Sequence, residues 1–380
     1  MKSLLIVLVS LLIGNAVAKP VNQLNITTHS YKLDRDGLWE NPVVSNTLRG
    51  AEKTNAILSF NGDMLGVEYQ LKYETEAEKT TIQKLFYIKD INDELSVQIG
   101  KFIENWQLGY AFNPLAVTDP YHPPNNNDDL NEKLGINAIA TRYILENGAL
   151  DFYMGDDTKQ RNAVRGYGYK SQGVRLNYFL NNNTDLSFII HKKEGVKTGF
   201  GAGFRHIAND NSKLYGSFFT RKGTTLASLN MPTATVGTYR ENDGRRYTRS
   251  MLGWHWISDN NTNLIAEISQ DDRGMNNQEW QNYKLRGAAG LALVRPNGLR
   301  QRYHFLRLGK KFNTHELSLS RRTSTDNSAL NTLKWSHDLA NNLQLNVSHS
   351  QTTGDVDSEY KAYFPDQNKT SLVLRYNFDF

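Results

Sequence analysis

Apolar and polar side chains alternate with a period of two along most of the chain. Between Leu65 and Tyr73 every second side chain is apolar, while the intervening positions are Gly, Glu, Gln and Lys. Because successive side chains of a β-strand point to opposite faces, such a segment has one apolar and one polar face. The same alternation recurs at residues 95–99, 150–154, 174–180, 186–190, 252–256, 343–347 and 372–380. The pattern predicts an all-β protein built from amphipathic strands.

Short turns rich in Asn, Asp or Gly join these strands in pairs. Eight such turns lie at residues 61–63, 91–93, 146–148, 181–184, 209–212, 258–263, 312–314 and 339–342. The connections between the pairs are often much longer, and the longest lie roughly at 104–134, 222–245, 272–298 and 352–368. If both termini lie on the side of the short turns, eight turns and nine outer connections require about 18 strands. Loss of one weak hairpin would leave 16.

This arrangement is typical of a transmembrane antiparallel β-barrel, whose strands of about ten residues face lipid on one side and water on the other. A soluble β-sandwich or propeller is the alternative, but its connections would not divide so consistently into short and long sets. A mean hydropathy of −0.58 fits the barrel, since the lumen and the outer connections contact water. After the first 18 residues no run of about 18 apolar residues exists, which excludes a helical membrane protein.

The beginning of the chain has the features of an export signal. A short basic start is followed by the apolar stretch Leu4–Gly14 and by the small-x-small motif Ala16–Ala18. We therefore expect cleavage before Lys19, with residues 1–18 as signal peptide and residues 19–380 as one barrel domain. A membrane anchor, the alternative, needs a longer apolar run.

Composition narrows the classes of function. The 380 residues include no cysteine, so no disulfide can form. Lys and Arg total 44 against 39 Asp and Glu, and the resulting charge of +5 is too even a mixture to indicate a nucleic-acid surface. Export would also separate the protein from nucleic acid. We expect no nucleic-acid partner.

The closing strand carries a resemblance to a known family. Residues 374–380 read Leu-Arg-Tyr-Asn-Phe-Asp-Phe, and they follow an export signal and alternation over the whole mature length. In these features the chain resembles the Gram-negative outer-membrane porin-like β-barrels. The resemblance implies that Tyr376, Phe378 and Phe380 form the signal read by the barrel-assembly machinery, and that the protein lies in the outer membrane among lipids and lipopolysaccharide. Monomers and homotrimers both occur among such barrels, so the oligomeric state stays open.

A second similarity involves the segment Gly100–Pro114, followed by Asp119 and Pro120. Its Gly-Lys, Trp-x-x-Gly and aromatic-Asn-Pro elements are similar to those of the large alginate-export-like barrels. In porins a comparable connection commonly folds into the lumen, so the resemblance implies a constriction loop, with an exposed surface loop as the alternative. The candidate constriction residues are Trp106, Tyr110, Phe112, Asn113, Pro114 and Tyr121.

Common catalytic signatures are absent from the sequence, which has no Gly-x-Ser-x-Gly, His-Glu-x-x-His or phosphate-binding glycine loop. His349 beside Ser350 invites comparison with outer-membrane lipases. Its spacing from Val347, however, puts His349 on the lipid-facing side near a strand end. We expect a protein that is not an enzyme and that has no cofactor or metal.

Small and aromatic residues predict two further features of the wall. Gly199, Gly201 and Gly203 alternate with larger residues, which fits a strand whose lumen face is bare to admit an inward loop or a bend. Trp254 and Trp335 share the parity of lipid-facing side chains, and we expect them in an interfacial aromatic girdle.

Strand parity also assigns charged residues to the lumen, because residues between lipid-facing neighbours must point inward. The cations assigned in this way are Lys72, Arg175, Arg205, Arg302, Lys334 and Arg375. The carboxylates on the same side are Glu68, Glu267, Glu316 and Asp379. An excess of cations would concentrate anions in a low-dielectric channel. Simple pairing of opposite charges across strands is the alternative.

A barrel of 16 to 18 strands leaves an aqueous channel unless something fills it. The sequence therefore predicts an outer-membrane porin for passive diffusion of small hydrophilic solutes, with anions such as acidic oligosaccharides or small carboxylates preferred. The alternatives are a polysaccharide-export barrel, a non-conducting adhesin or scaffold barrel and, least favoured, an outer-membrane lipid hydrolase.

Overall fold

The computed structural model describes most of the chain. Its backbone description covers residues 23–34, 54–64, 67–74, 79–118, 135–158, 168–224, 228–230, 238–240, 244–285, 299–363 and 368–379. Side chains are described for residues 67–70, 82–118, 135–158, 168–224, 244–285, 299–362 and 368–376. The expectations for residues 1–18, and for the side chains of Lys72, Tyr121, Phe378 and Phe380, lie outside these ranges.

Eighteen strands form one antiparallel sheet. The first nine are β1 (Gln23–Asp34), β2 (Thr54–Met64), β3 (Val67–Glu74), β4 (Lys79–Asp90), β5 (Leu95–Phe102), β6 (Ile136–Leu145), β7 (Gly148–Asp156), β8 (Lys170–Asn181) and β9 (Thr184–Lys193). The other nine are β10 (Gly199–Asn209), β11 (Ser212–Lys222), β14 (Arg246–Ile257), β15 (Thr262–Asp271), β16 (Arg302–Phe312), β17 (His315–Ser324), β18 (Ala329–Ala340), β19 (Leu343–Thr353) and β20 (Asn368–Asp379). Outside this sheet lie the paired strands β12 (Ser228–Asn230) and β13 (Thr238–Arg240), the helix α3 (Asn277–Lys284) and the short π-helix η5 (Glu359–Tyr363).

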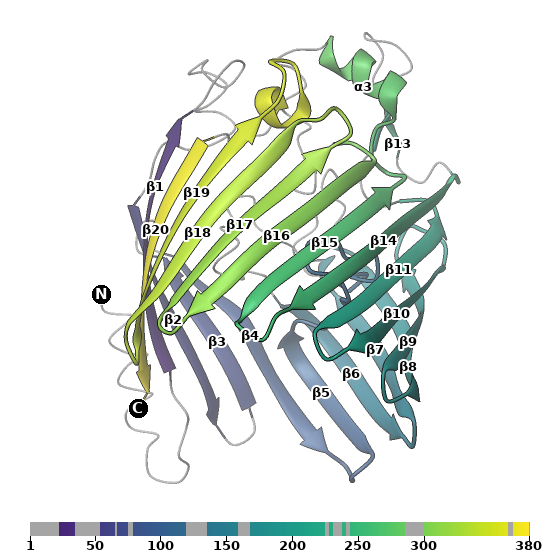
Figure 1. Ribbon diagram of the computed structural model, residues 1–380. Coiled ribbons are helices and arrows are strands. Elements are labelled where there is room, and N and C mark those ends of the chain that lie inside the picture. The colour runs from purple at the N-terminus through teal and green to yellow at the C-terminus, as the bar shows by residue number, and fades with distance from the viewer. Residues whose placement is uncertain are drawn as a thin grey trace.

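The sheet closes on itself and forms a barrel of tilted strands (Figure 1). Strands pair with their neighbours along the chain, and β11 pairs with β14 past the small hairpin. The first strand, β1, pairs with both β2 and β20. Its register with β20 runs without interruption from Gln23 opposite Asp379 to Asp34 opposite Asn368. The predicted antiparallel β-barrel of 18 strands is confirmed.

The connections divide into two sets, one at each rim of the barrel (Figure 1). Short links lie at the rim where β20 ends, and the longer connections lie at the other rim with α3 and η5. The turn predicted at 61–63 is wrong, because these residues continue β2 and the link to β3 follows Met64. The reason is that the ladder between β2 and β3 begins at the pair Met64–Val67 and runs through the Asn-Gly-Asp stretch. The other predicted turns fall where strands meet.

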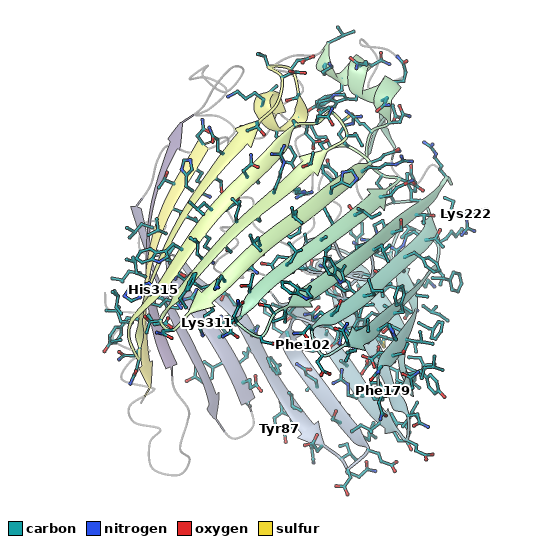
Figure 2. The ribbon with its side chains drawn as sticks, viewed as in Figure 1. Tyr87, Phe102, Phe179, Lys222, Lys311 and His315 are labelled. Carbon is teal, nitrogen blue, oxygen red and sulfur yellow. The ribbon has the colours of Figure 1, made fainter. Side chains whose placement is uncertain are left out.

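The two faces of the wall follow the predicted parity. On β9, Phe188 and Ile190 are 48% and 52% exposed, whereas Ile189 and His191 are almost completely buried. The exposed side chains point away from the lumen. In a membrane, lipid rather than water contacts this outer face. Figure 2 shows side chains projecting along the wall, with Phe179 near the rim of the short turns and Lys222 at the opposite rim.

The long connections carry a helix at their rim. Asn276 begins α3 with a capping box, since its side chain accepts the backbone N–H of Glu279 while the Glu279 carboxylate accepts the backbone N–H of Asn276. Trp280 and Tyr283 form the buried face of the helix, and their rings stack on each other. No helix within the described residues is long and apolar enough to cross a membrane.

Candidate functional site

The connection after β5 enters the barrel. We call its described part, residues 103–118, the inward segment. Its two ends are joined near the wall, where the hydroxyl of Thr118 donates to the carbonyl of Glu104 at 2.8 Å. The segment contacts the wall between β7 and β10 and also contacts β15, which lies eight strands from β5 in the ring of 18. The inward segment therefore crosses the lumen.

Trp106 attaches the inward segment to the near wall. Its indole is 1% exposed and meets the ring of Tyr153 edge-on, with 6.1 Å between centroids. The guanidinium of Arg175 lies 5.3 Å from the Trp106 ring centroid, and the indole N–H donates to Oε1 of Glu104 at 2.8 Å. Gly173 leaves the space that the indole needs, since a Cβ there would lie 2.9 Å from a ring carbon of Trp106.

Glu267, on β15, binds the inward segment at the far wall. Its Oε1 atom accepts the backbone N–H of Tyr110 at 2.5 Å, and its Oε2 atom accepts those of Ala111 and Phe112 at 2.8 and 3.0 Å. The hydroxyl of Tyr215 donates to the same carboxylate at 2.7 Å. Successive backbone N–H groups that converge in this way form a nest for an anion. The inward segment thus supplies hydrogen-bond donors to a buried carboxylate of the wall.

Aromatic rings cover this attachment. Tyr110 stacks on Phe305 with 5.6 Å between centroids, and Phe112 lies 6.2 Å from Tyr303. The guanidinium of Arg322 lies over both rings of the second pair, 5.3 Å from Phe112 and 4.7 Å from Tyr303. The far wall therefore offers the segment apolar surface as well as a charge.

A strip of glycine on β10 receives the middle of the segment. A Cβ at Gly201 would lie 2.7 Å from Leu115, and one at Gly203 would lie 2.5 Å from Leu108 and 3.0 Å from Leu115. The expectation of a bare lumen face that admits an inward loop is confirmed.

Asn113 and Pro114 shape the turn of the segment. The Asn113 side chain accepts the backbone N–H of Gly109 at 2.7 Å, and its carbonyl accepts that of Ala116 at 3.1 Å. Pro114 is buried. Tyr110 is 56% exposed and is the most exposed of the described candidate constriction residues.

Four of the predicted lumen cations have the inward parity in the described strands. They are Arg175, Arg205, Lys334 and Arg375. Arg175 pairs with Asp151 at 2.7 Å, and the same carboxylate accepts the Nε–H of Arg142 at 2.7 Å. Arg205 lies 3.8 Å from Asp185. For Arg175 and Arg205 the arrangement matches the pairing of opposite charges across strands.

The inward assignment of Arg302 is wrong. Leu306 and Leu308 on β16 are both 49% exposed, and Arg302 shares their outward parity. On the outer face its Nε–H donates to the side chain of Gln270 at 3.2 Å. Tyr303, which is 4% exposed, points inward instead. The prediction took the aromatic Tyr303 and Phe305 as lipid-facing, whereas the rings of the inward segment give both an apolar contact inside the lumen.

A basic cluster in the lumen was missed by sequence reasoning. It consists of Arg221, Arg249 and His191 around the ring of Phe219. The two guanidinium groups lie 4.7 and 5.3 Å from that ring, and Arg221 donates to Nδ1 of His191 at 2.8 Å. The Nε of Arg221 and the Nε2 of His191 have no hydrogen-bond partner in the described structure. The outward parity of Phe218, which is 46% exposed, would have assigned Arg221 to the lumen.

The buried carboxylate of Glu359 connects the outer connections to the lumen wall through hydrogen bonds. Glu359 in η5 accepts hydrogen bonds from the backbone of Leu299 at 2.7 Å, from the Tyr303 hydroxyl at 2.7 Å and from the Ser324 hydroxyl at 2.6 Å. Burial raises the pKa of Glu359 above its usual range, although these hydrogen bonds oppose the shift. The outer connections and the attachment of the inward segment thus meet at Tyr303.

Within the described residues, no group of three or more His, Asp or Glu side chains is placed to hold a metal ion. No protein-family model and no curated protein matches the sequence.

Solved structures match along nearly the whole chain. OccK11 (OpdR) of Pseudomonas aeruginosa has a TM-score of 0.59 at 9% identity, covering 95% of this chain and 96% of its own. OccAB1 of Acinetobacter baumannii has a TM-score of 0.58 at 11% identity, with 95% and 97% covered. The outer membrane protein opdK of Pseudomonas aeruginosa has a TM-score of 0.55 at 11% identity, with 94% and 99% covered. The chain therefore has the fold of the outer-membrane porin-like β-barrels.

Proposed function

We propose that the protein is an outer-membrane porin, not an enzyme, through which small hydrophilic solutes diffuse passively with a preference for anions. The observation that carries this proposal is the inward segment, which crosses an 18-stranded barrel and is bound at its far end by Glu267. A barrel of this size leaves an aqueous path through its centre. A segment that crosses this path narrows it without closing it.

The basic cluster supports the anion preference. Arg221 and Arg249 share one aromatic ring, and Arg221 makes no ion pair with a carboxylate within the described residues. By contrast, Arg175 is paired with Asp151, and Arg307 lies 2.9 Å from Glu316. The positive charge of Arg221, which has no carboxylate partner among the described residues, would raise the local concentration of anions in a narrow, low-dielectric passage. Acidic oligosaccharides and small carboxylates are the solutes we expect.

The likeness to the solved Occ structures supports the assignment to outer-membrane channels. Insertion of β20 by the barrel-assembly machinery and contact with outer-membrane lipids and lipopolysaccharide belong to the same proposal. A monomer and a homotrimer are both compatible with it.

Reversal potentials in a salt gradient across a planar bilayer test the proposal. We expect the refolded protein to conduct and to prefer anions, and the preference should fall as ionic strength rises because screening shortens the range of the charges. The double variant R221Q/R249Q should lose most of this preference. A barrel without conductance would favour the non-conducting adhesin or scaffold.

A matched control lies on the same two strands. Lys222 and Arg246 are register partners next to Arg221, but they are exposed on the outward face. K222Q/R246Q removes the same amount of charge and should leave the reversal potential unchanged. A cation-selective wild-type protein, or equal shifts in the two double variants, would contradict an anion preference set by the basic cluster.

A further inference from the structure

Outward side chains on β5, β6 and β7 change from apolar to polar or charged between one row of register partners and the next. One row across strands β5 to β9 contains Ile99, Ile139, Met154, Gln172 and Lys192. The next row, closer to the long connections, contains Lys101, Asn137, Asp156 and Lys170, with Glu194 directly after β9. The long connections of an outer-membrane barrel are extracellular, so these rows lie at the level of the outer leaflet.

A groove of ≈ 680 Å³ lies over the two rows. Its apolar lining includes Ile139 and Met154, which are 48% and 63% exposed, and its charged lining consists of Lys170, Lys192, Asp156 and Glu194. The volume is in the range of about 300–1,000 Å³ that is typical of ligand sites. The groove therefore joins a surface for an acyl chain to a surface for a polar headgroup.

The ammonium groups at the groove have weak partners or none. Lys192 makes no hydrogen bond or ion pair within the described part of the chain, although it belongs to the row of Ile139 and Met154. The side chain of Lys170 is 69% exposed, and its Nζ lies 3.8 Å from Asp156, a geometry that contributes little in water. Glu194 accepts the backbone N–H of Lys170. An anion between Lys170 and Lys192 would therefore meet charge that the protein leaves available.

We propose that this groove is a fixed site for one phosphorylated glycolipid of the outer leaflet, such as lipid A. The inference rests on the proposed outer-membrane location. Lys170 and Lys192 bind a phosphate group as point charges, the second by extending from the apolar row to the headgroup level. One acyl chain lies on Ile139 and Met154. The carboxylate of Asp156 accepts hydrogen bonds from sugar hydroxyls, and this contact favours a glycolipid over a phospholipid.

Native mass spectrometry of the purified full-length barrel in non-ionic detergent, titrated with diphosphoryl lipid A, tests the site. We expect one molecule to bind with higher affinity than the rest. K170Q/K192Q should weaken this binding at least about tenfold, since each lysine near an anionic headgroup contributes about 1 kcal/mol. R302Q, which removes one positive charge, is the control for each of the single variants K170Q and K192Q, because Arg302 is an exposed, outward residue at the same rim but on β16.

Two further measurements separate the parts of the proposal. Met154→Trp fills the groove with a side chain that the lipid-facing wall tolerates, and it should weaken binding with both lysines in place. Phosphatidylglycerol should bind more weakly than diphosphoryl lipid A. Equal losses in K170Q, K192Q and R302Q, unchanged affinity in Met154→Trp, or equal affinity for phosphatidylglycerol would overturn the site. Lipid binding is measured without conductance, so its failure is distinct from failure of the porin proposal.

Discussion

Glu267 and Tyr110 connect the far wall of the barrel to the inward segment, with 2.5 Å between Oε1 of the glutamate and the backbone nitrogen of the tyrosine. Two more backbone N–H groups and the Tyr215 hydroxyl complete the coordination of this carboxylate. The four hydrogen bonds to this buried carboxylate compensate for the hydration that it loses on burial. The same contact fixes how far the segment extends across the lumen.

Replacement of Glu267 should release the far end of the inward segment. Hydrogen bonds to charged groups contribute about 1.5–3 kcal/mol each, so E267A should lose the attachment, whereas E267Q retains one acceptor oxygen and should have an intermediate effect. Single-channel recording should show larger and noisier currents in E267A. D185N, which removes an inward carboxylate from the Arg205 pair, is the control. Identical currents in E267A and wild type would show that the attachment does not set the width of the passage.

Overpacking of the glycine strip should displace the segment from its other contact. A Cβ added at Gly203 would lie only 2.5 and 3.0 Å from Leu108 and Leu115, so G203L should cost about 1–3 kcal/mol of local packing and raise the conductance. L108A in the same chain makes room and should restore part of the wild-type current. If the double variant G203L/L108A behaves as the sum of the two single variants, the strip and the segment are not coupled.

Asp151 should oppose the anion preference. It is 4% exposed and pairs with both Arg175 and Arg142. D151N leaves two guanidinium groups without their carboxylate, so reversal potentials should shift further toward anions and the barrel should unfold more easily by about 1–3 kcal/mol. Heat-modifiable gel mobility reports the second effect. A shift toward cations would exclude an electrostatic role for this triad.

Acid should stabilise the contact made by Glu359. Its pKa is raised by burial, which means that the folded structure binds the proton more tightly than the unfolded chain does. The stabilisation is therefore complete below the usual glutamate pKa of about 4.3 and is lost as the pH rises through the raised value. Hydrogen exchange at Tyr360 and Ala362, corrected for intrinsic rates, should slow at low pH in wild type. E359Q should show no such dependence.

The neighbouring carboxylate of Asp357 should give the opposite dependence of stability on pH. A hydrogen bond from Lys284 lowers the pKa of Asp357, so its contribution is present above the usual aspartate value and is lost as the pH falls through the lowered one. D357N should therefore remove stability at neutral pH and leave the acid effect of Glu359 intact. The same pH dependence in E359Q and wild type would count against Glu359 as its source.

The barrel was predictable because each strand repeats one physical requirement, an apolar side toward lipid and a polar side toward water. The positions of turn-forming residues then indicated the number of hairpins. The exception at 61–63 shows the limit of that signal: an Asn-Gly-Asp stretch continues β2, since its pairing with β3 extends to Met64. A turn motif indicates where a chain can reverse, and pairing decides where it does.

The lumen was less predictable, because its environment is made by another part of the chain. Tyr303 and Phe305 pack inward against the rings of Phe112 and Tyr110, although their aromatic character had suggested lipid-facing positions and therefore an inward Arg302. Glu267 was assigned to the lumen correctly, but nothing in its own strand indicates that it binds a segment more than 150 residues away. Alternation assigns a face, and only the folded chain shows what that face contacts.

The central claim, that the inward segment lies in the path of the solute, is tested most directly at Tyr110. Its side chain is 56% exposed, and the protein contains no cysteine, so Y110C introduces the only thiol. Addition of a charged methanethiosulfonate reagent during single-channel recording should produce a lasting drop in current. The control Y178C places the thiol on the outward face of β8, where labelling should leave the current unchanged. Full current through Y110C after complete labelling would contradict the claim.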